Sequence, residues 1–500
     1  MTREQYETIP TGSLKAIAKD RGIKNVSKKS RDTLTEEMLM LDAREAAIAA
    51  RTEAEKAEEK TEVKSDATDV SEEKPKKRTS RRIVVTTAKD TEKEAAKEST
   101  RKEEPKTEDT EDNSDTDIMD ELFPEESGIT ADGILEVMGD GFGFIRSDNY
   151  LPGDGDVYVA PSQIRRFGLK TGDIVRGTTR IKSITEKFAA LMYVESVNGM
   201  NPDELSKRPN FEDLTPIFPN EKIKLEAPGA PVAMRIMDVM CPVGKGQRGM
   251  IVSQPKAGKT TLLKDVAKSV KKNNPEIHLI VLLIDERPEE VTDIKEAIEG
   301  ENVEVIYSTF DELPEHHKRV SEMVIERAKR LVEHGNDVMI LIDSITRLTR
   351  AYNLTVPPSG RTLSGGLDPA ALHMPKKFFG AARNMREGGS LTILATALVE
   401  TGSKMDDVVY EEFKGTGNME MVLDRKLSEK RVFPAIDILK SGTRRDDLLL
   451  TDEEMEAVSN VRRGFNALKP EDAADKVIDL FARTKNNTEF CQLVKKMKFL

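Results

Sequence analysis

The sequence predicts an α/β nucleotide-binding domain of the P-loop type, preceded by a small OB-type β-barrel, an N-terminal helical module and a disordered charged linker. Three observations lead to this prediction. Apolar runs alternate with amphipathic runs after residue 249, which is typical of a parallel sheet covered on both faces. A phosphate-binding loop separates the first apolar run from a helical run. Five short β-like runs precede them within residues 133–197, as in a small barrel.

Length and composition bound the possible classes of protein. A chain of 500 residues is too long for one hydrophobic core, so two or more domains are expected. The net charge of −12 does not by itself indicate a nucleic-acid-binding protein, but an acidic segment can mask a basic face. Cys241 and Cys491 are expected to be reduced, packed residues. No signal peptide and no apolar run of membrane-spanning length is present, which predicts a cytoplasmic protein without a membrane partner.

Composition divides the chain into five regions. The second region, residues 51–127, is rich in Glu, Lys, Thr, Asp and Ser and has almost no aromatic residues. Such a segment cannot bury enough apolar surface to offset its chain entropy, so we expect disorder. Its basic patch, residues 74–82, fits a solvated linker better than an RNA-binding arm. The expected regions are 1–50 (helical module), 51–127 (linker), 128–200 (OB-fold domain), 201–235 (connector) and 236–500 (ATPase domain).

Two phenylalanines mark the barrel as a candidate RNA-binding domain. Its expected strands are 134–138, 142–146, 156–159, 174–181 and 190–197. Phe142 and Phe144 occupy alternate positions of the second strand, which places both rings on the same face. Bases stack on aromatic rings of an open barrel face, and Arg146 can contact a phosphate or a base. The alternative is that both rings belong to the core of a glycine-rich hairpin. The basic residues of 162–167 favour the RNA interpretation.

Residues 254–261 have the pattern of a phosphate-binding loop, although Ser253 takes the position of its first glycine. A loop between a strand and a helix directs backbone N–H groups at a polyphosphate. Lys259 can reach the β and γ oxygens, and the Thr260 hydroxyl can bind Mg²⁺. The alternative is a chance Gly-Lys-Thr in a surface turn, which the order of strand, loop, lysine, threonine and helix disfavours.

Two of the later strands end in acidic residues. The expected strands are 250–253, 278–284, 303–308, 338–342 and 391–397, and the clearest helix is 318–333. Asp343 directly follows its strand and is expected to hold the hydration shell of Mg²⁺. Glu286 can orient or deprotonate an attacking water. The alternative for Glu286 is an acidic residue at a helix N-terminus. His316 and His317 open the helix and are expected on a solvated face rather than at a metal.

Two glycine-containing loops, 359–366 and 401–404, lack strand or helix patterns and carry the isolated cations Arg361 and Lys404. Such loops suit mobile contacts to a phosphodiester strand. They fit ordinary surface loops equally well.

From residue 133 to residue 500 the chain resembles the bacterial transcription termination factors of the Rho family. Residues 13–41 resemble the N-terminal helical module of that family, whereas the charged linker is not general to it. The motifs that carry the resemblance are residues 140–146, 162–167, 246–249, 255–260, 283–292, 343–347 and 415–420.

The resemblance implies a RecA-type ATPase and helicase that binds nascent single-stranded RNA and moves along it 5′ to 3′. It implies a homohexameric ring with ATP and Mg²⁺ at subunit interfaces, and RNA release from the RNA polymerase elongation complex. Catalysis would rest on Lys259, Glu286, Asp343 and Arg444. The metal would lie at Thr260 and Asp343, and Arg444 would act as an arginine finger on the neighbouring subunit's nucleotide.

The resemblance also assigns binding residues. Phe433 would pack on adenine, and Arg361 and Lys404 would contact RNA in the central pore. Arg361 stands where lysine is usual and Phe188 where tyrosine is common, so RNA grip can differ. The nucleotide-binding positions are Lys256, Ala257, Gly258, Lys259, Thr260, Thr261, Arg287, Arg431 and Phe433. The primary RNA-binding positions are Phe142, Phe144, Arg146 and Phe188.

Two other functions are compatible with parts of the sequence. A subunit of a rotary ATP synthase would share the RecA-type core, but the aromatic strand ahead of the core argues against it. An RNA-binding chaperone without ATPase activity would need no intact Lys259, Glu286 or Arg444. RNA-stimulated ATP hydrolysis distinguishes the three possibilities.

Overall fold

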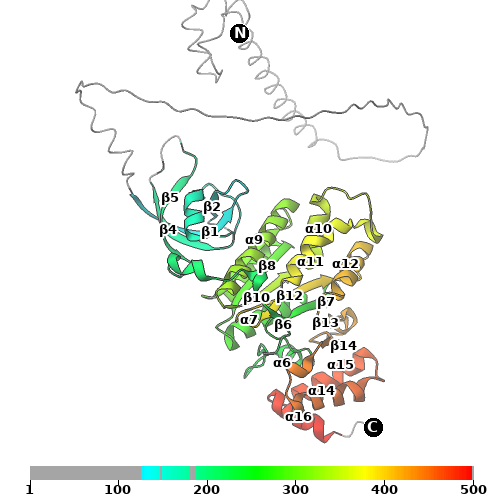
Figure 1. The fold of residues 1–500 in the computed structure, drawn as a ribbon. Coiled ribbons are helices and arrows are strands. Elements are labelled where there is room, and N and C mark those ends of the chain that lie inside the picture. Colours follow the sequence, from blue (N-terminus) through cyan, green and yellow to red (C-terminus); the bar gives the residue numbers. More distant parts are fainter. Residues whose placement is uncertain (1–125, 147–148, 181, 183–185, 498–500) are drawn as a thin grey trace, which may run out of the picture. The chain divides into compact units, whose positions relative to one another are not determined.

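The computed structural model describes residues 126–146, 149–180, 182 and 186–497. The predicted helical module and all but the last two residues of the predicted linker lie outside the described residues. The described chain begins with a closed five-stranded barrel and continues into a larger domain built on a nine-stranded sheet (Figure 1). This order of a small barrel followed by an α/β domain confirms the predicted fold class.

The barrel closes in the strand order β1-β2-β3-β5-β4. Its elements are β1 (Glu126–Val137), β2 (Gly143–Arg146), β3 (Val157–Val159), α5 (Pro161–Phe167), β4 (Ile174–Arg180) and β5 (Ala189–Val197). All five predicted strands are present; β1 begins eight residues before its predicted start at 134, and the other four differ by one residue at an end. Leu135, Val159 and Val175 fill the interior and are fully buried. Gly177 must be glycine, because a Cβ there would lie 1.9 Å from the carbonyl oxygen of Tyr193 on the paired strand.

The large sheet runs in the order β14-β13-β7-β12-β10-β8-β9. Its strands are β7 (Arg248–Ser253), β8 (His278–Glu286), β9 (Val303–Thr309), β10 (Asp337–Asp343), β12 (Ser390–Leu398), β13 (Met419–Leu423) and β14 (Ile436–Thr443). Strands β13 to β9 in this order are parallel, and β14 pairs antiparallel with β13. Two short strands, β6 (Pro216–Ile217) and β11 (Arg383–Met385), extend the sheet beside β12. The five predicted strands are confirmed, whereas β13, β14, β6 and β11 were not predicted.

Helices cover both faces of this sheet, as predicted from its continuous apolar strands. In β8, Leu279, Val281 and Leu283 pack in one hydrophobic cluster, and the alternate residues pack in the other. The first cluster includes α6 (Val232–Met240), α7 (Lys259–Asn273), α8 (Pro288–Ile298), α14 (Asp452–Phe465), α15 (Pro470–Ala482) and α16 (Asn487–Lys496). The second includes α9 (Pro314–Glu333), α10 (Ile345–Thr355), α11 (His373–Gly380) and α12 (Lys404–Lys414).

Short helices occupy the connections. They are η2 (Pro202–Lys207), η3 (Phe211–Asp213), η4 (Ser364–Gly366), η5 (Pro369–Leu372), α13 (Arg425–Glu429) and η6 (Asp446–Leu448). Helix α9 begins four residues earlier than its predicted start. This places His317 in the first turn, where it is 6% exposed and its Nδ1 lies 2.7 Å from the Ser308 hydroxyl. The prediction that His317 lies on a solvated face was therefore wrong, because β9 packs against this turn.

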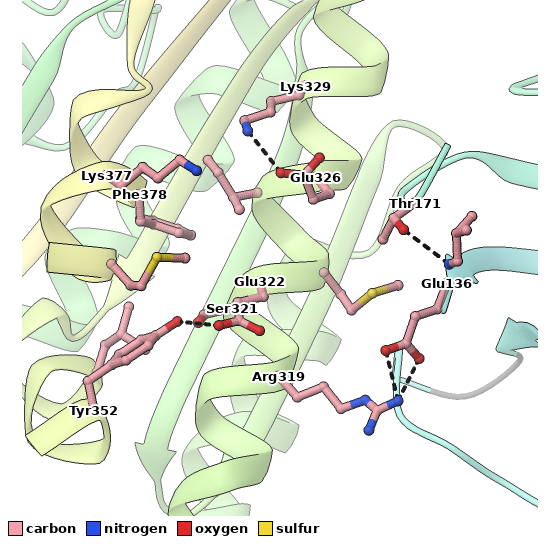
Figure 2. Close-up of a pocket in the computed structure, with 15 residues that line it drawn as sticks. Glu136, Thr171, Arg319, Ser321, Glu322, Glu326, Lys329, Tyr352, Lys377 and Phe378 are labelled. Carbon is pink, nitrogen blue, oxygen red and sulfur yellow. Dashed lines mark hydrogen bonds and ion pairs between the residues drawn. The ribbon is translucent and has the colours of Figure 1, made fainter. Parts of the chain in front are cut away.

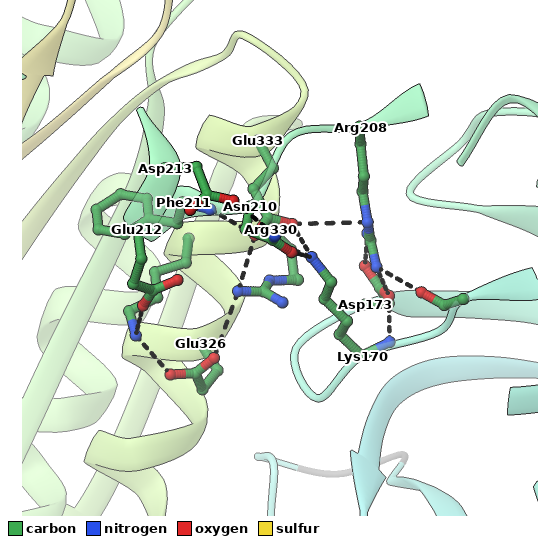
Figure 3. A network of polar contacts seen from close by, with 12 residues as sticks. Lys170, Asp173, Arg208, Asn210, Phe211, Glu212, Asp213, Glu326, Arg330 and Glu333 are labelled. Carbon is green, nitrogen blue, oxygen red and sulfur yellow. Dashed lines mark hydrogen bonds and ion pairs between the residues drawn. The ribbon is translucent and has the colours of Figure 1, made fainter. Parts of the chain in front are cut away.

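A buried network of charges joins the barrel to the C-terminal end of α9 (Figure 3). Its centre is Glu333, whose side chain is fully buried and pairs with Lys170, Arg208 and Arg330. Arg208 also binds both carboxylate oxygens of Asp173 at 2.6 and 2.8 Å. Burial by itself raises the pKa of Asp173, but the Arg208 guanidinium outweighs it and holds that pKa below the usual value. Buried carboxylates of this kind are stable only when paired donors surround them.

Both cysteines are free and buried, as predicted. Burial raises the pKa of the Cys241 thiol to about 12, so it stays protonated. Within residues 126–497, as far as the structure describes them, no helix combines the length and apolar character that crossing a membrane requires.

Candidate functional site

The predicted phosphate-binding loop lies between β7 and α7 and lines a cleft of about 520 Å³. The loop is shaped by two residues in left-handed backbone conformations, Lys256 at φ 68° and Gly258 at φ 94°. Gly258 is the N-cap of α7, so the first backbone N–H groups of this helix are free to face an anion. Predicted residues that line the same cleft are Lys256, Gly258, Lys259, Thr260, Thr261, Glu286 and Arg287.

Lys259 lies between the two predicted acidic residues. Its Nζ atom is 2.9 Å from Oε1 of Glu286 and 2.6 Å from Oδ1 of Asp343. Both carboxylates are buried, with 4% of Glu286 and 1% of Asp343 exposed. Burial would lower the pKa of Lys259, but the two carboxylates outweigh it and raise that pKa, so the lysine is charged. Three residues separated by up to 84 positions thus meet at one point.

Asp343 has one carboxylate oxygen available for a metal. Its Oδ1 accepts hydrogen bonds from Lys259 and from the Thr396 hydroxyl at 2.8 Å. Its Oδ2 is buried and has no hydrogen-bond partner. The described residues hold no group of three or more His, Cys, Asp or Glu side chains arranged around a metal. One carboxylate and the Thr260 hydroxyl nevertheless fit Mg²⁺, which keeps several waters and takes further oxygens from phosphates.

Arg347 lines this cleft, and no role was predicted for it from the sequence. Its Nη1 atom lies 3.5 Å from Oδ2 of Asp285 and 3.7 Å from Oε2 of Glu286. It comes from the first turn of α10, which begins directly after Asp343 and Ser344. Its position one helical turn after Asp343, at the end of a strand, could have marked Arg347 as a residue of the cleft. Only the fold shows that this turn of α10 faces β8.

A second pocket, of about 410 Å³, adjoins the phosphate-binding loop. Ala257, Thr261 and Phe433 line it, and Phe433 is 53% exposed. An exposed ring beside the loop is consistent with the predicted packing on adenine. Arg431 lies two residues before Phe433, is exposed, and does not line either pocket.

Arg444 lies apart from the phosphate-binding cleft of its own chain. It follows β14 and lines a different cleft of about 340 Å³, together with Lys440 and Arg462. Its backbone N–H donates to the carbonyl of Asn418 at 2.8 Å, and its side chain is exposed. No carboxylate of the described chain forms an ion pair with it. A phosphate contact by Arg444 would therefore involve a nucleotide held by another copy of the chain.

The barrel presents a cluster of aromatic rings, which we call the aromatic face and define as Phe142, Phe144, Tyr158 and Phe188. The ring centroids of Phe142 and Phe144 are 5.8 Å apart, and Phe188 lies 5.1 Å from Phe144. All four side chains are partly exposed, so they are not core residues of the barrel. Tyr158 was missed, because its place opposite Phe144 depends on the pairing of β2 with β3.

Arg146 lies beneath the aromatic face. Its guanidinium carbon is 4.8 Å from the centroid of the Phe144 ring. Only 4% of the side chain is exposed, and it forms ion pairs with Glu136 and Asp156. In this arrangement Arg146 supports Phe144, and a contact with RNA requires the guanidinium to leave a carboxylate.

The two predicted pore loops lie side by side. Arg361 is exposed ahead of η4, and Lys404 is the exposed first residue of α12. The loops touch at Gly365, where an added Cβ would lie 2.5 Å from the backbone nitrogen of Met405. Two cations from segments 43 positions apart thus occupy one region of the surface. The roles assigned to individual residues of the cleft, the aromatic face and these loops stay predictions.

The fold and the site define a P-loop ATPase with an aromatic-faced RNA-binding barrel. A family model described as "Rho termination factor, RNA-binding domain" matches residues 131–203. A second model, "ATP synthase alpha/beta family, nucleotide-binding domain", matches residues 233–443. Among solved structures, an ATPase from the type III secretion system of pathogenic bacteria aligns with a TM-score of 0.48 and 20% identity, covering 63% of this chain and 93% of that chain.

Relatives that match most of the chain identify the family. The transcription termination factor Rho of Pseudomonas aeruginosa is 55% identical over 74% of this chain and 88% of its own length. The Bacillus subtilis protein of the same name is 56% identical over 73% of this chain and 84% of its own length. That of Aquifex aeolicus is 54% identical over 72% of this chain and 83% of its own. The chain belongs to the Rho family of transcription termination factors.

Proposed function

We propose that this chain ends transcription as a homohexameric translocase that pulls nascent RNA 5′ to 3′ from the RNA polymerase elongation complex in the cytoplasm. The general activity follows from family membership: the protein is a transcription termination factor that binds RNA and hydrolyses ATP in response to it. The ring, the direction of movement, the polymerase as partner and the individual site residues are the proposed part.

The cleft supports ATP hydrolysis by positioning and charge stabilisation. Glu286 would accept a proton from the attacking water, because its carboxylate lies in the cleft beside Lys259, where the phosphates would bind. Lys259 would move from the two carboxylates to the phosphates when a nucleotide binds. Thr260 and Asp343 would hold Mg²⁺, which neutralises charge on the phosphate oxygens. Arg347 would act as a positioning residue, because its Nη1 atom lies 3.7 Å from Oε2 of Glu286.

The position of Arg444 supports a shared site. It is exposed in a cleft that excludes the phosphate-binding loop of its own chain. In a ring, head-to-tail contacts would bring it to the next subunit's nucleotide. An arginine supplied in this way contributes roughly 10³–10⁵ in rate in enzymes that use one.

RNA would be held at two places. The aromatic face would stack bases, each worth about 1–3 kcal/mol. Arg361 and Lys404 would contact the phosphodiester strand that passes through the ring, and their loops lie together as such a role requires. The acidic net charge of the chain does not oppose this, because local cations decide phosphate binding.

The single observation that carries the proposal is the meeting of Lys259, Glu286 and Asp343 in one cleft of a chain that also carries the aromatic face. The test is the rate of ATP hydrolysis by the full chain with and without single-stranded RNA, beside duplex DNA of equal length. We expect stimulation by single-stranded RNA alone. Equal rates under all conditions would favour a rotary-type ATPase, and RNA binding without hydrolysis would favour an RNA chaperone.

A further inference from the structure

A contact between the barrel and α9 links the aromatic face to the larger domain. Glu136, at the end of β1, forms ion pairs with two arginines, one from the barrel and one from the larger domain. Arg146 contacts it from beneath Phe144, with Nε 2.9 Å from Oε2. Arg319, on α9, contacts it from the other side, with Nη2 2.8 Å from Oε1 and 2.6 Å from Oε2. Figure 2 shows the Arg319 guanidinium directed at this carboxylate.

The ion pair between Glu136 and Arg319 lies beside a pocket and not within a closely packed interface. Glu136 and Arg319 line a pocket of about 380 Å³ between β1 and helices α9, α10 and α11. The pocket separates β1 from the helices, and the ion pair between Glu136 and Arg319 crosses from the barrel to α9 at its edge. The side chains are partly shielded, with 16% of Glu136 and 34% of Arg319 exposed. A charge-assisted, two-oxygen contact in such a place is stronger than one at an open surface.

The first turns of α9 continue the connection to the ATPase cleft. Two residues before Arg319, His317 contacts the hydroxyl of Ser308 at the end of β9. Two residues after Ser308, the backbone N–H of Phe310 donates to the carbonyl of Glu286 at 3.2 Å. Glu286 is the proposed base, so the end of β9 connects the start of α9 to the segment that carries this base.

We propose that Glu136 and Arg319 are positioning residues that couple RNA on the aromatic face to the ATPase cleft. The inference rests on the proposed function, because it requires RNA-stimulated hydrolysis. RNA phosphate competes with Glu136 for the Arg146 guanidinium, since both are anions that bind the same donor group. When Arg146 turns to RNA, Glu136 is left to Arg319 alone. The position of α9, and of the Glu286 segment connected to it, would then change. RNA would bind with different affinity to the arrangement in which Glu136 contacts both arginines and to the one in which it contacts Arg319 alone.

The test compares Arg319→Met with Lys170→Met in the full chain. Lys170 is the matched control, because it also joins the barrel to α9, through Glu333 at 3.3 Å, and its side-chain contacts among the described residues are with Asn210 and Glu333 rather than with the aromatic face. Three quantities are measured: affinity for a short single-stranded pyrimidine RNA, ATP hydrolysis without RNA, and the fold stimulation at saturating RNA. Arg319→Lys, which keeps the cation, tests for rescue.

For Arg319→Met we expect that RNA still binds and that RNA-free hydrolysis is unchanged, whereas stimulation at saturating RNA is lowered about 5-fold or more, the usual lower size of a coupling between sites. Lys170→Met should keep its stimulation, and Arg319→Lys should regain part of it. Full stimulation of Arg319→Met would overturn the inference. An equal loss of stimulation in Lys170→Met would also overturn it, because it would show that stimulation depends only on docking of the barrel on α9. Absence of stimulation in the unmodified protein would instead refute the proposed function.

Discussion

The ammonium nitrogen of Lys259 lies 2.6 Å from Oδ1 of Asp343. The lysine of the phosphate-binding loop therefore neutralises the carboxylate that is expected to hold the metal. Glu286 shares the same ammonium at 2.9 Å. Arrival of phosphate oxygens would draw the lysine away and free both carboxylates together, one for the metal and one for water. Nucleotide binding and preparation of the catalytic groups would then be one event.

We predict that Lys259→Ala abolishes ATP hydrolysis while the barrel still binds RNA. The lysine contacts only the cleft, and the aromatic face lies in another domain. Hydrolysis rate and RNA affinity are measured on the same preparation. Lys264→Ala is the control, because Lys264 lies on the same helix and pairs only with the exposed Asp293. Near-normal turnover of Lys259→Ala would refute the assignment of the loop.

We predict that Glu286→Gln keeps nucleotide affinity but loses most turnover. Glutamine preserves the shape of the side chain and removes the basic carboxylate that activates water. A nucleotide-binding titration beside a rate assay separates the two effects. Glu289→Gln, at an exposed position of the next helix, should change neither quantity. A parallel loss of affinity and rate would show that Glu286 is structural.

The sequence predicts the central strands of the sheet because each is a continuous apolar run that both helical layers bury. Strand β13 escapes this pattern, since its five residues alternate between buried and partly exposed and include Glu420. Strand β14 also departs from a continuous apolar run, because it carries charges at Asp437 and Lys440. Their places in the sheet are set by pairing with β7 and with each other, which no local pattern records.

The candidate site divides in the same way. Lys259 and Thr260 are predictable because a phosphate-binding loop is contiguous in sequence. Tyr158 and Arg347 reach their sites only through strand pairing and helix placement. The burial of Arg146 between Glu136 and Asp156 is likewise a tertiary property, because a strand pattern does not say which carboxylates surround its last residue.

We predict that Phe144→Ala weakens binding of single-stranded RNA by about 1–3 kcal/mol, the usual value of a base stacked on an aromatic ring. RNA-free hydrolysis should stay unchanged. Binding is measured by titration with a labelled pyrimidine RNA. Tyr193→Ala is the control, since Tyr193 is an exposed aromatic residue of the same barrel outside the aromatic face. If the unfolding temperature falls sharply and RNA affinity follows it, Phe144 is a core residue instead.

We predict that Asp173→Asn destabilises the protein at pH 7 by about 3 kcal/mol, because it removes one of the two carboxylates that neutralise the buried Arg208 guanidinium. The folded-state pKa of Asp173 is held below its usual 3.8. The contribution of the Asp173 charge to the free energy of unfolding is therefore present above pH 3.8 and disappears as the pH falls through the folded-state pKa.

The free energy of unfolding of both proteins, measured with urea at pH 7 and below pH 3.8, checks this. The difference between Asp173→Asn and the unmodified protein should shrink at the acidic pH. Glu195→Gln removes a partly exposed ion pair of the same barrel, with Arg176, and should have little effect at either pH. A difference that is the same at both pH values would contradict the role of the Asp173 charge.

RNA-driven ATP hydrolysis at a site that two subunits share can be tested by mixing two inactive variants. Arg444→Ala keeps an intact phosphate-binding loop, and Lys259→Ala keeps an intact arginine. Each should be almost inactive alone, even with RNA. After subunit exchange, verified by energy transfer between labelled chains, some interfaces pair an intact loop with an intact Arg444. We predict that RNA-stimulated hydrolysis then returns. Mixed assemblies as inactive as either parent, despite verified exchange, would show that Arg444 does not act on the nucleotide of a neighbouring subunit.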